Sequence, residues 1–300
     1  MIYDIRLTIA CNYPAAVADA RHLLCVRPRG DCGQHVLSSH VDVSPHPDEQ
    51  HGERDFFGNF VEDVTVRRPH RDLDVEMRAR VRVDRAPADL VATPTLVEIA
   101  DAAITWREAH GLSPIHFLGR SRRIVPVPAV TTYAEEPLSA VPEAGTAVLD
   151  LARRIHADFA YEPGATDVRT GVAEAFARRR GVCQDFAHVM VAGLRGVGIP
   201  AAYVSGFLRT DPPPGKPRLE GADSMHAWAA AWLGPEVGWI GFDPTNGVVA
   251  GRDHIIVAMG RDYADVAPVA GVVVTAGHQR TSHAVDVVPL DDDTGSAGSA

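Results

Sequence analysis

A helix followed by strands in the second half of the chain limits the possible folds more than any other feature. The segment from about Cys183 to Gly196 has apolar residues three or four positions apart, the spacing of an amphipathic helix, and Gly198 and Pro200 end it. Three apolar segments of strand length follow, at Ala201–Leu208, His226–Leu233 and Trp239–Pro244. This order predicts helices packed on an antiparallel sheet, which is an α+β fold.

The first 135 or so residues instead have the pattern of short strands. Ile2–Ala10 and Asp63–Val66 have strand periodicity, and from Val75 to Val83 apolar residues alternate with charged ones. Such alternation is typical of a half-exposed antiparallel sheet or sandwich. One segment, Thr95–His110, has a helical pattern, so this half is not purely β.

A proline-rich stretch separates the two halves. We expect a loop containing Pro126, Pro128, Pro137 and Pro142, then helices over 146–159 and about 171–180. We therefore predict a mainly β N-terminal domain over residues 1–140, an α+β domain over 141–290 and a disordered tail over 291–300.

Composition excludes several classes of function. The formal charge of −10 over 300 residues is unsuited to binding nucleic acid or anionic membranes. No stretch of about 18 apolar residues occurs and the N-terminus lacks the pattern of a secretory signal, so we expect a cytoplasmic protein. The four cysteines form no CxxC pair, and we expect reduced thiols. Oligomeric state is not readable from these features.

Cys183 is the first candidate for chemistry because it opens the predicted helix. Unpaired backbone N–H groups and the helix dipole stabilise a thiolate there, although a lone cysteine is more often a packed, inert residue. His188 lies five positions further on, roughly 140° around the helix, so it is not expected to serve as the base. A zinc site of Cys183, His188 and His226 lacks paired ligand spacing and a fourth ligand, so we expect no metal and no cofactor.

His226 and Asp243 lie on two predicted strands joined by a turn. If the loop is the four residues 234–237, Leu233 pairs with Gly238, Asp243 falls opposite Trp228, and both share a face with His226. A five-residue loop would place them on opposite faces. Taken singly, His226 is more often a surface strand histidine and Asp243 a turn residue.

Four blocks in this order resemble bacterial members of the transglutaminase-like superfamily. They are Gly181-Val182-Cys183-Gln184-Asp185-Phe186-Ala187-His188 with Gly198-Ile199-Pro200-Ala201, then His226-Ala227-Trp228, then Gly238-Trp239 with Phe242-Asp243-Pro244-Thr245-Asn246, and finally Gly260-Arg261-Asp262-Tyr263. The resemblance implies a papain-like core of helices on an antiparallel sheet, preceded by a β domain. It also implies that Cys183 is the nucleophile, His226 the base and Asp243 the residue that orients the base.

The resemblance further predicts an enzyme that acts on amide bonds of proteins or peptides through a thioester. We expect hydrolysis, as in a cysteine peptidase or amidase, more than crosslinking. The backbone N–H of Cys183 is the first expected oxyanion donor and the Tyr161 hydroxyl the second, although Tyr161 is equally well explained as a packed aromatic. Trp228 and Trp239 could form an acyl-binding slot, and Gln184 a supporting or substrate-binding side chain. The alternative is a non-catalytic scaffold that binds a partner.

Overall fold

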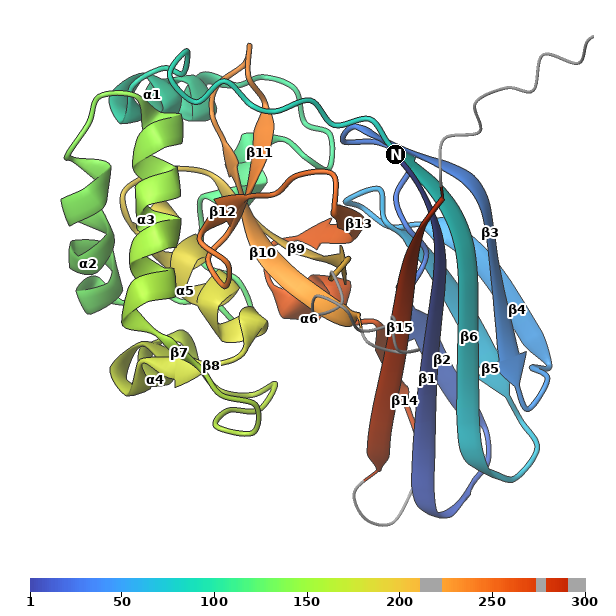
Figure 1. The fold of residues 1–300 in the computed structure, drawn as a ribbon. Helices are drawn as coiled ribbons and strands as arrows, with labels where there is room; N and C mark the ends of the chain where they lie inside the picture. The colour runs from blue at the N-terminus through green and yellow to red at the C-terminus, as the bar shows by residue number, and fades with distance from the viewer. Residues whose placement is uncertain (211–222, 274–278, 291–300) are drawn as a thin grey trace, which may run out of the picture.

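The computed structural model describes residues 1–210, 223–273 and 279–290. It has a lobe made of strands and a lobe of helices packed on a second sheet, as Figure 1 shows. Among the helices of the described residues, none has the length and apolar character needed to cross a membrane.

The β lobe consists of two four-stranded antiparallel sheets, in the orders β15-β1-β6-β3 and β14-β2-β5-β4. Its strands are β1 (Ile2–Val17), β2 (Ala20–Leu24), β3 (Gln34–Ser44), β4 (Glu49–Arg54), β5 (Phe60–Val66), β6 (His70–Val83), β14 (Val269–Val272) and β15 (Arg280–Leu290). Apolar residues of both sheets, among them Leu24, Val64 and Val75, form one core, so the lobe is a sandwich. The alternation in Val75–Val83 is confirmed: these apolar residues are buried and the charged ones lie on the other face.

The second lobe surrounds a five-stranded antiparallel sheet in the order β12-β11-β10-β9-β13. Its strands are β9 (Ala201–Leu208), β10 (Ser224–Trp232), β11 (Trp239–Asp243), β12 (Val248–Val249) and β13 (His254–Gly260), and β7 (Ala160–Tyr161) pairs separately with β8 (Arg180–Gly181). The helices are α1 (Leu96–Thr105), η1 (Pro114–Phe117), α2 (Pro128–Leu138), α3 (Ala144–Asp158), α4 (Val172–Arg178), α5 (Cys183–Gly196) and α6 (Tyr263–Val266). The predicted α+β fold is confirmed.

Helix α5 is central to this lobe, and it is buried from Gln184 to Arg195. It packs against α2, α3 and α4 on one side and against β9 and β10 on the other. A helix enclosed in this way must satisfy its polar side chains internally, and Asp185, His188 and Arg195 all have hydrogen-bond partners. Its first residue, Cys183, packs against the core cluster that residues of the sandwich share with Ala187 and Tyr203 of the second lobe.

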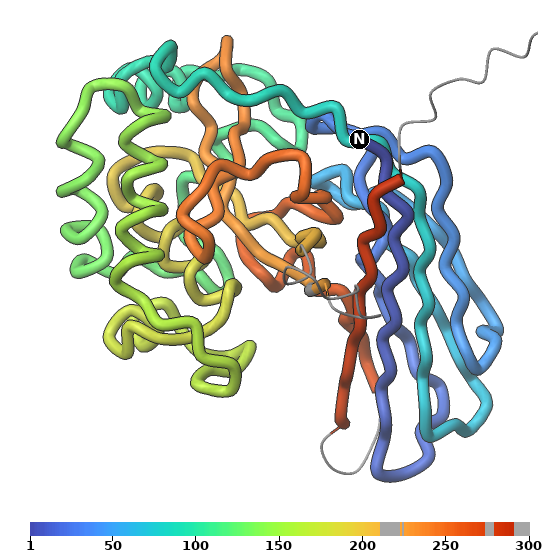
Figure 2. The backbone as a smooth tube through the Cα atoms, viewed as in Figure 1, coloured from blue at the N-terminus to red at the C-terminus, as the bar shows by residue number. Residues whose placement is uncertain are grey.

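The lobes do not follow the predicted limits of 1–140 and 141–290. Both ends of the chain contribute to the sandwich, where β15 pairs with β1 along its whole length and β14 pairs with β2 (Figure 2). Helices α1 and α2 pack in the core of the second lobe, through residues such as Ile99 and Val130. Only two residues of β15 are buried, so its local pattern gave little sign of a strand whose partner is far away in sequence. The predicted tail lies outside the described residues.

The proline-rich stretch is a helix, not the predicted loop. Pro128 is the first residue of α2, where the missing N–H would have had no partner, and its fixed φ suits a helix start. Pro137 lies in the last turn, so the carbonyl of Tyr133 loses its helical donor there. The Arg154 guanidinium of α3 donates to that carbonyl instead, at 3.1 Å.

Candidate active site

The start of α5 is fixed by a short turn of chain around Cys183. The Val182 backbone N–H donates to the Asp185 carboxylate at 2.8 Å, and the Thr166 hydroxyl donates to the same oxygen at 2.6 Å. A Cβ at Gly181 would collide with this carboxylate, so the position requires glycine. Cys183 is therefore held as the first helical residue, where its own backbone N–H has no acceptor within the helix. Its side chain is partly exposed.

The hairpin of β10 and β11 has the register that the triad requires. Trp232 pairs with Trp239 and Ala229 with Phe242, and the Leu233 N–H donates to the Gly238 carbonyl at 2.8 Å. The predicted four-residue loop is confirmed. His226 and Asp243 consequently project from the same face, and the His226 Nε2 donates to Asp243 Oδ2 at 2.8 Å.

Asp243 is fully buried and accepts five hydrogen bonds. Oδ2 accepts from His226, from the Asn246 amide at 2.6 Å and from His254 Nε2 at 3.1 Å. Oδ1 accepts from the backbone N–H groups of Thr245 at 2.9 Å and Asn246 at 3.3 Å. Burial alone would raise the pKa of Asp243, but these donors, His226 and His254 first, hold it well below its ordinary value. The carboxylate is a permanently charged, immobile acceptor.

The environment of His226 favours its charged form. Burial lowers its pKa, whereas the hydrogen bond to Asp243, a side-chain hydrogen bond with Cys183 and the charges of both partners raise it to about 10. Since Nε2 faces Asp243, Nδ1 is the ring nitrogen left for the Cys183 sulfur. The structure thus brings together the three side chains that the sequence singled out, in the order sulfur, imidazole, carboxylate. An imidazolium beside a sulfur stabilises a thiolate.

Tyr161 lies near this group. Strand β7 pairs in parallel with β8, placing Tyr161 beside Gly181, two residues before Cys183. Partial burial, followed by the charge of Cys183, raises the pKa of the Tyr161 hydroxyl, which puts the two side chains within electrostatic range. The side chain is more than half exposed and its ring contacts Phe186 edge-on. Its role as an oxyanion donor stays a prediction.

The side chains predicted to contact substrate are mostly buried. Trp228 is 1% exposed and Gln184 is 8% exposed. Trp228 and the partly buried Trp239 line a cavity of about 850 Å³, whose lining residues do not include Cys183, His226 or Asp243. A role for the two tryptophans as an acyl-binding slot stays a prediction.

His188 has its own buried partner. It is 2% exposed, and its Nε2 accepts the Tyr263 N–H at 3.2 Å. That it does not serve as the base stays a prediction. Burial lowers its pKa to about 4, so it is neutral at ordinary pH.

His254 is the residue of this site that the sequence did not reveal. It opens β13 as a polar residue before an apolar run, and it is 5% exposed beside Asp243. His226, Asp243 and His254 form the one group of metal-ligand type found among the described residues. His254 Nδ1 accepts the Gly251 N–H at 3.2 Å, so the ring proton is on Nε2, where it blocks metal binding. The three side chains are better described as a carboxylate with two histidine donors than as a metal site.

Comparison with known proteins agrees with this geometry. Residues 3–82 match the family described as the bacterial transglutaminase-like N-terminal region, and residues 131–244 match the transglutaminase-like superfamily. A crystal structure of a candidate cysteine protease from Cytophaga hutchinsonii has a TM-score of 0.74 and 21% identity, covering 98% of this chain and 92% of the other. The fold is therefore that of the transglutaminase-like cysteine proteases.

Relatives by sequence extend the match over most of the chain. An uncharacterized protein of Mycobacterium tuberculosis is 36% identical over 270 residues, covering 89% of this chain and 86% of the relative. One from Mycobacterium leprae is 33% identical over 265 residues, covering 88% and 90%. A protein-glutamine gamma-glutamyltransferase of Pseudomonas aeruginosa is 39% identical over 117 residues, but these cover only 38% of this chain and 17% of that protein. This chain belongs to the transglutaminase-like superfamily.

Proposed function

We propose that this chain is a cysteine-dependent acyl-transfer enzyme that cleaves amide bonds of proteins or peptides through a thioester on Cys183. The observation that carries the proposal is the position of His226, which is hydrogen-bonded to a buried, charged Asp243 and lies close enough to Cys183 for that side chain to raise its pKa. This proposal is supported by chemistry, because the reaction needs a thiol nucleophile, an imidazole that moves the proton and a carboxylate that orients the imidazole.

The first half of the reaction forms the thioester. The Cys183 thiolate attacks the amide carbonyl carbon, and the Cys183 N–H donates to the oxyanion that develops. The His226 imidazolium then gives its proton to the departing amine, the C–N bond breaks, and the acyl group remains on sulfur. Asp243 keeps the imidazole in the tautomer and orientation that this proton transfer requires.

The second half releases the acyl group. His226, now neutral, takes a proton from water, the resulting hydroxide attacks the thioester, and the C–S bond breaks to give a carboxylic acid and the thiolate. An amine in place of water would give a new amide and thus transamidation. We favour water because it is always present as an acceptor.

The reactivity of Cys183 is the first test. The chain offers its own references, because burial raises the pKa of Cys32 to about 11 and that of Cys25 to about 12. Iodoacetamide at neutral pH, read by mass spectrometry of peptides, should therefore alkylate Cys183 well before the other cysteines. His226→Ala should slow this labelling, whereas Cys32→Ala should leave it unchanged.

The same measurement separates the enzyme from the non-catalytic scaffold. If Cys183 reacts no faster than a free cysteine, and His226→Ala changes nothing, the scaffold is favoured. Incubation of the reactive chain with a peptide pool in heavy-oxygen water identifies the acceptor. Hydrolysis places one heavy oxygen in the new carboxyl group, and transamidation with an added amine places none.

A further inference from the structure

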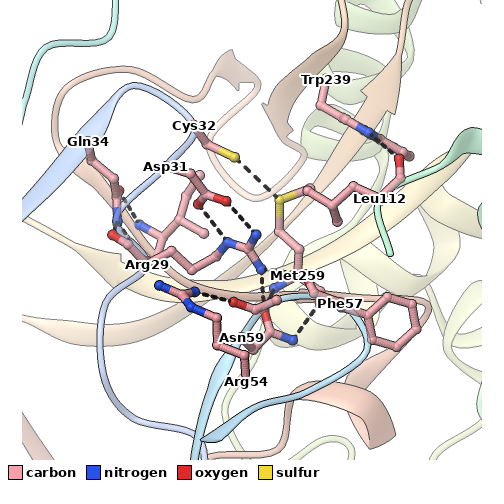
Figure 3. A network of polar contacts seen from close by, with 12 residues as sticks. Arg29, Asp31, Cys32, Gln34, Arg54, Phe57, Asn59, Leu112, Trp239 and Met259 are labelled. Carbon is pink, nitrogen blue, oxygen red and sulfur yellow. Dashed lines mark hydrogen bonds and ion pairs between the residues drawn. The ribbon is translucent and has the colours of Figure 1, made fainter. Parts of the chain in front are cut away.

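The outer edge of β13 is covered by side chains of the β lobe rather than by another strand. The Gln34 amide donates to the Ile256 carbonyl at 2.7 Å and accepts the Ile256 N–H at 2.9 Å. Asn59 does the same for Met259, with both distances 2.8 Å (Figure 3). Both amides are 0% exposed. Each carboxamide replaces the backbone of a missing neighbour strand, so β13 is held in register by the β lobe.

A buried arginine keeps one of these amides in place. Arg29 donates to the Asn59 side-chain oxygen at 2.6 Å and to the Phe57 carbonyl at 2.9 Å, and it pairs with Asp31 through two hydrogen bonds (Figure 3). Its own backbone N–H donates to the Ile256 carbonyl at 3.0 Å. The edge contact is therefore built of rigid, fully bonded groups.

A second arginine holds the turn that leads into β13. The Arg85 guanidinium donates to the carbonyls of Gly251 at 2.7 Å and His254 at 3.0 Å. Within that turn the Gly251 N–H donates to His254 Nδ1 at 3.2 Å. Arg85 thus holds the backbone of this turn, and the turn in its place holds the ring of His254.

The ring of His254 connects this turn to Asp243 through a hydrogen bond. Because Nδ1 accepts a hydrogen bond, the neutral ring carries its proton on Nε2, which donates to Asp243 Oδ2 at 3.1 Å. This oxygen also accepts from His226. The Trp228 ring packs edge-on against His254 with ring centres 5.2 Å apart, and it also contacts the ring of His226.

We propose that His254 is a positioning residue, which fixes the Asp243 carboxylate so that His226 stays directed at Cys183, and that the β lobe holds His254 in place. The proposal rests on the proposed function, since it assigns His254 a part in the same reaction. It gives the β lobe a role in aligning the acid of a triad located in the other lobe.

Two substitutions of almost equal size test the hydrogen bond itself. In His254→Gln the side-chain nitrogen reaches the place of Nε2 and can still donate to Asp243. In His254→Asn the shorter amide reaches only the place of Nδ1, so the bond to Asp243 is lost. We expect the rate of Cys183 alkylation at neutral pH to fall by about tenfold in the asparagine variant, the usual effect of losing a hydrogen bond to a charged group. The glutamine variant should retain most of the rate.

Circular dichroism and thermal unfolding establish that both variants fold. If the asparagine variant does not fold, His254→Met, which has the length of glutamine without its donor, takes its place in the comparison. Equal rates in the donor-lacking variant and the native chain would overturn the proposal, as would equal losses in the two variants. His226→Ala, measured alongside, keeps the two questions apart. If alkylation does not depend on His226, the proposed function fails; if it does and the donor-lacking variant is normal, only the role of His254 fails.

Discussion

Replacing Asp243 by asparagine changes one heavy atom and should leave His226 mostly uncharged at pH 7. Five N–H donors converge on the carboxylate, three on Oδ2 and two on Oδ1. An amide has one acceptor oxygen and one NH₂ group, so in either orientation its NH₂ faces at least two donors. Turning the NH₂ toward the histidines would force His226 to carry its proton on Nδ1, where it could no longer accept a proton from the Cys183 thiol.

The magnitude follows from the pKa of His226. In the native chain it is raised from 6.5 to about 10, so nearly every His226 is charged at pH 7. Without the carboxylate, burial is the largest remaining influence and lowers the pKa, so 6.5 is an upper limit unless Cys183 compensates. At that limit about a quarter of the imidazoles are charged at pH 7. With both the charge and the tautomer affected, we expect the rate of amide cleavage to fall about a hundredfold or more.

Nitrogen NMR of the His226 imidazole across pH measures this directly. The native ring should stay charged to beyond pH 8, and the Asp243→Asn ring should titrate near or below 6.5. Asp253→Asn is the matched control, because the Asp253 carboxylate accepts from the Tyr3 hydroxyl and pairs with Arg209 rather than with a histidine. A His226 that titrates near 6.5 in the native chain, or is still charged above pH 8 in the Asp243 variant, would refute the reasoning.

The raised pKa of His226 also predicts how the free energy of unfolding depends on pH. A pKa raised by folding adds stability that is complete below the unfolded value of 6.5 and disappears as the pH rises to about 10. The native chain should therefore lose part of its free energy of unfolding across this window. Urea unfolding at several pH values should show a weaker slope in Asp243→Asn, and equal slopes in both chains would contradict the assignment.

Two further substitutions test the oxyanion donor and the sheet edge. Tyr161→Phe should slow single-turnover acylation of Cys183 by about tenfold, less than a buried oxyanion donor would, because the side chain is half exposed; an unchanged rate would remove Tyr161 from the site. Gln34→Leu leaves the Ile256 N–H buried without its acceptor and should lower the free energy of unfolding by about 2 to 4 kcal/mol. Replacing the exposed Gln279 by leucine should change it by less than about 0.5 kcal/mol, and an equal effect at both positions would contradict the edge contact.

The parts of this fold that the sequence predicted are those determined by neighbours in the chain. Helix α5 and strand β9 begin and end at the predicted residues because Gly198 and Pro200 mark the boundary between them. The register of β10 and β11 followed from the length of one turn, and that register alone placed His226 and Asp243 on one face.

The parts it did not predict depend on contacts between distant segments. Strand β15 is mostly exposed, and its pairing with β1 joins the two ends of the chain. His254 belongs to the site only because β13 lies beside β9 and its turn is held by Arg85. A histidine that starts an apolar strand is a signal of a buried polar contact, but sequence does not say which group it contacts.

The two lobes are joined through a shared core, because strands β9 and β13 of the second lobe pack against the sandwich. Residues of β9 and β13, among them Tyr203, Phe207 and Ile255, are buried in the same core as the strands of the β lobe. Residues 131–244, the part that matches the transglutaminase-like superfamily, end before β13 begins. A chain limited to that part would lack β13, so the edge of β9 would be exposed. It would also lack His254, which donates a hydrogen bond to Asp243. The sandwich therefore completes the second lobe by covering the edge of β13, and under the proposal made above for His254 it also helps to align Asp243.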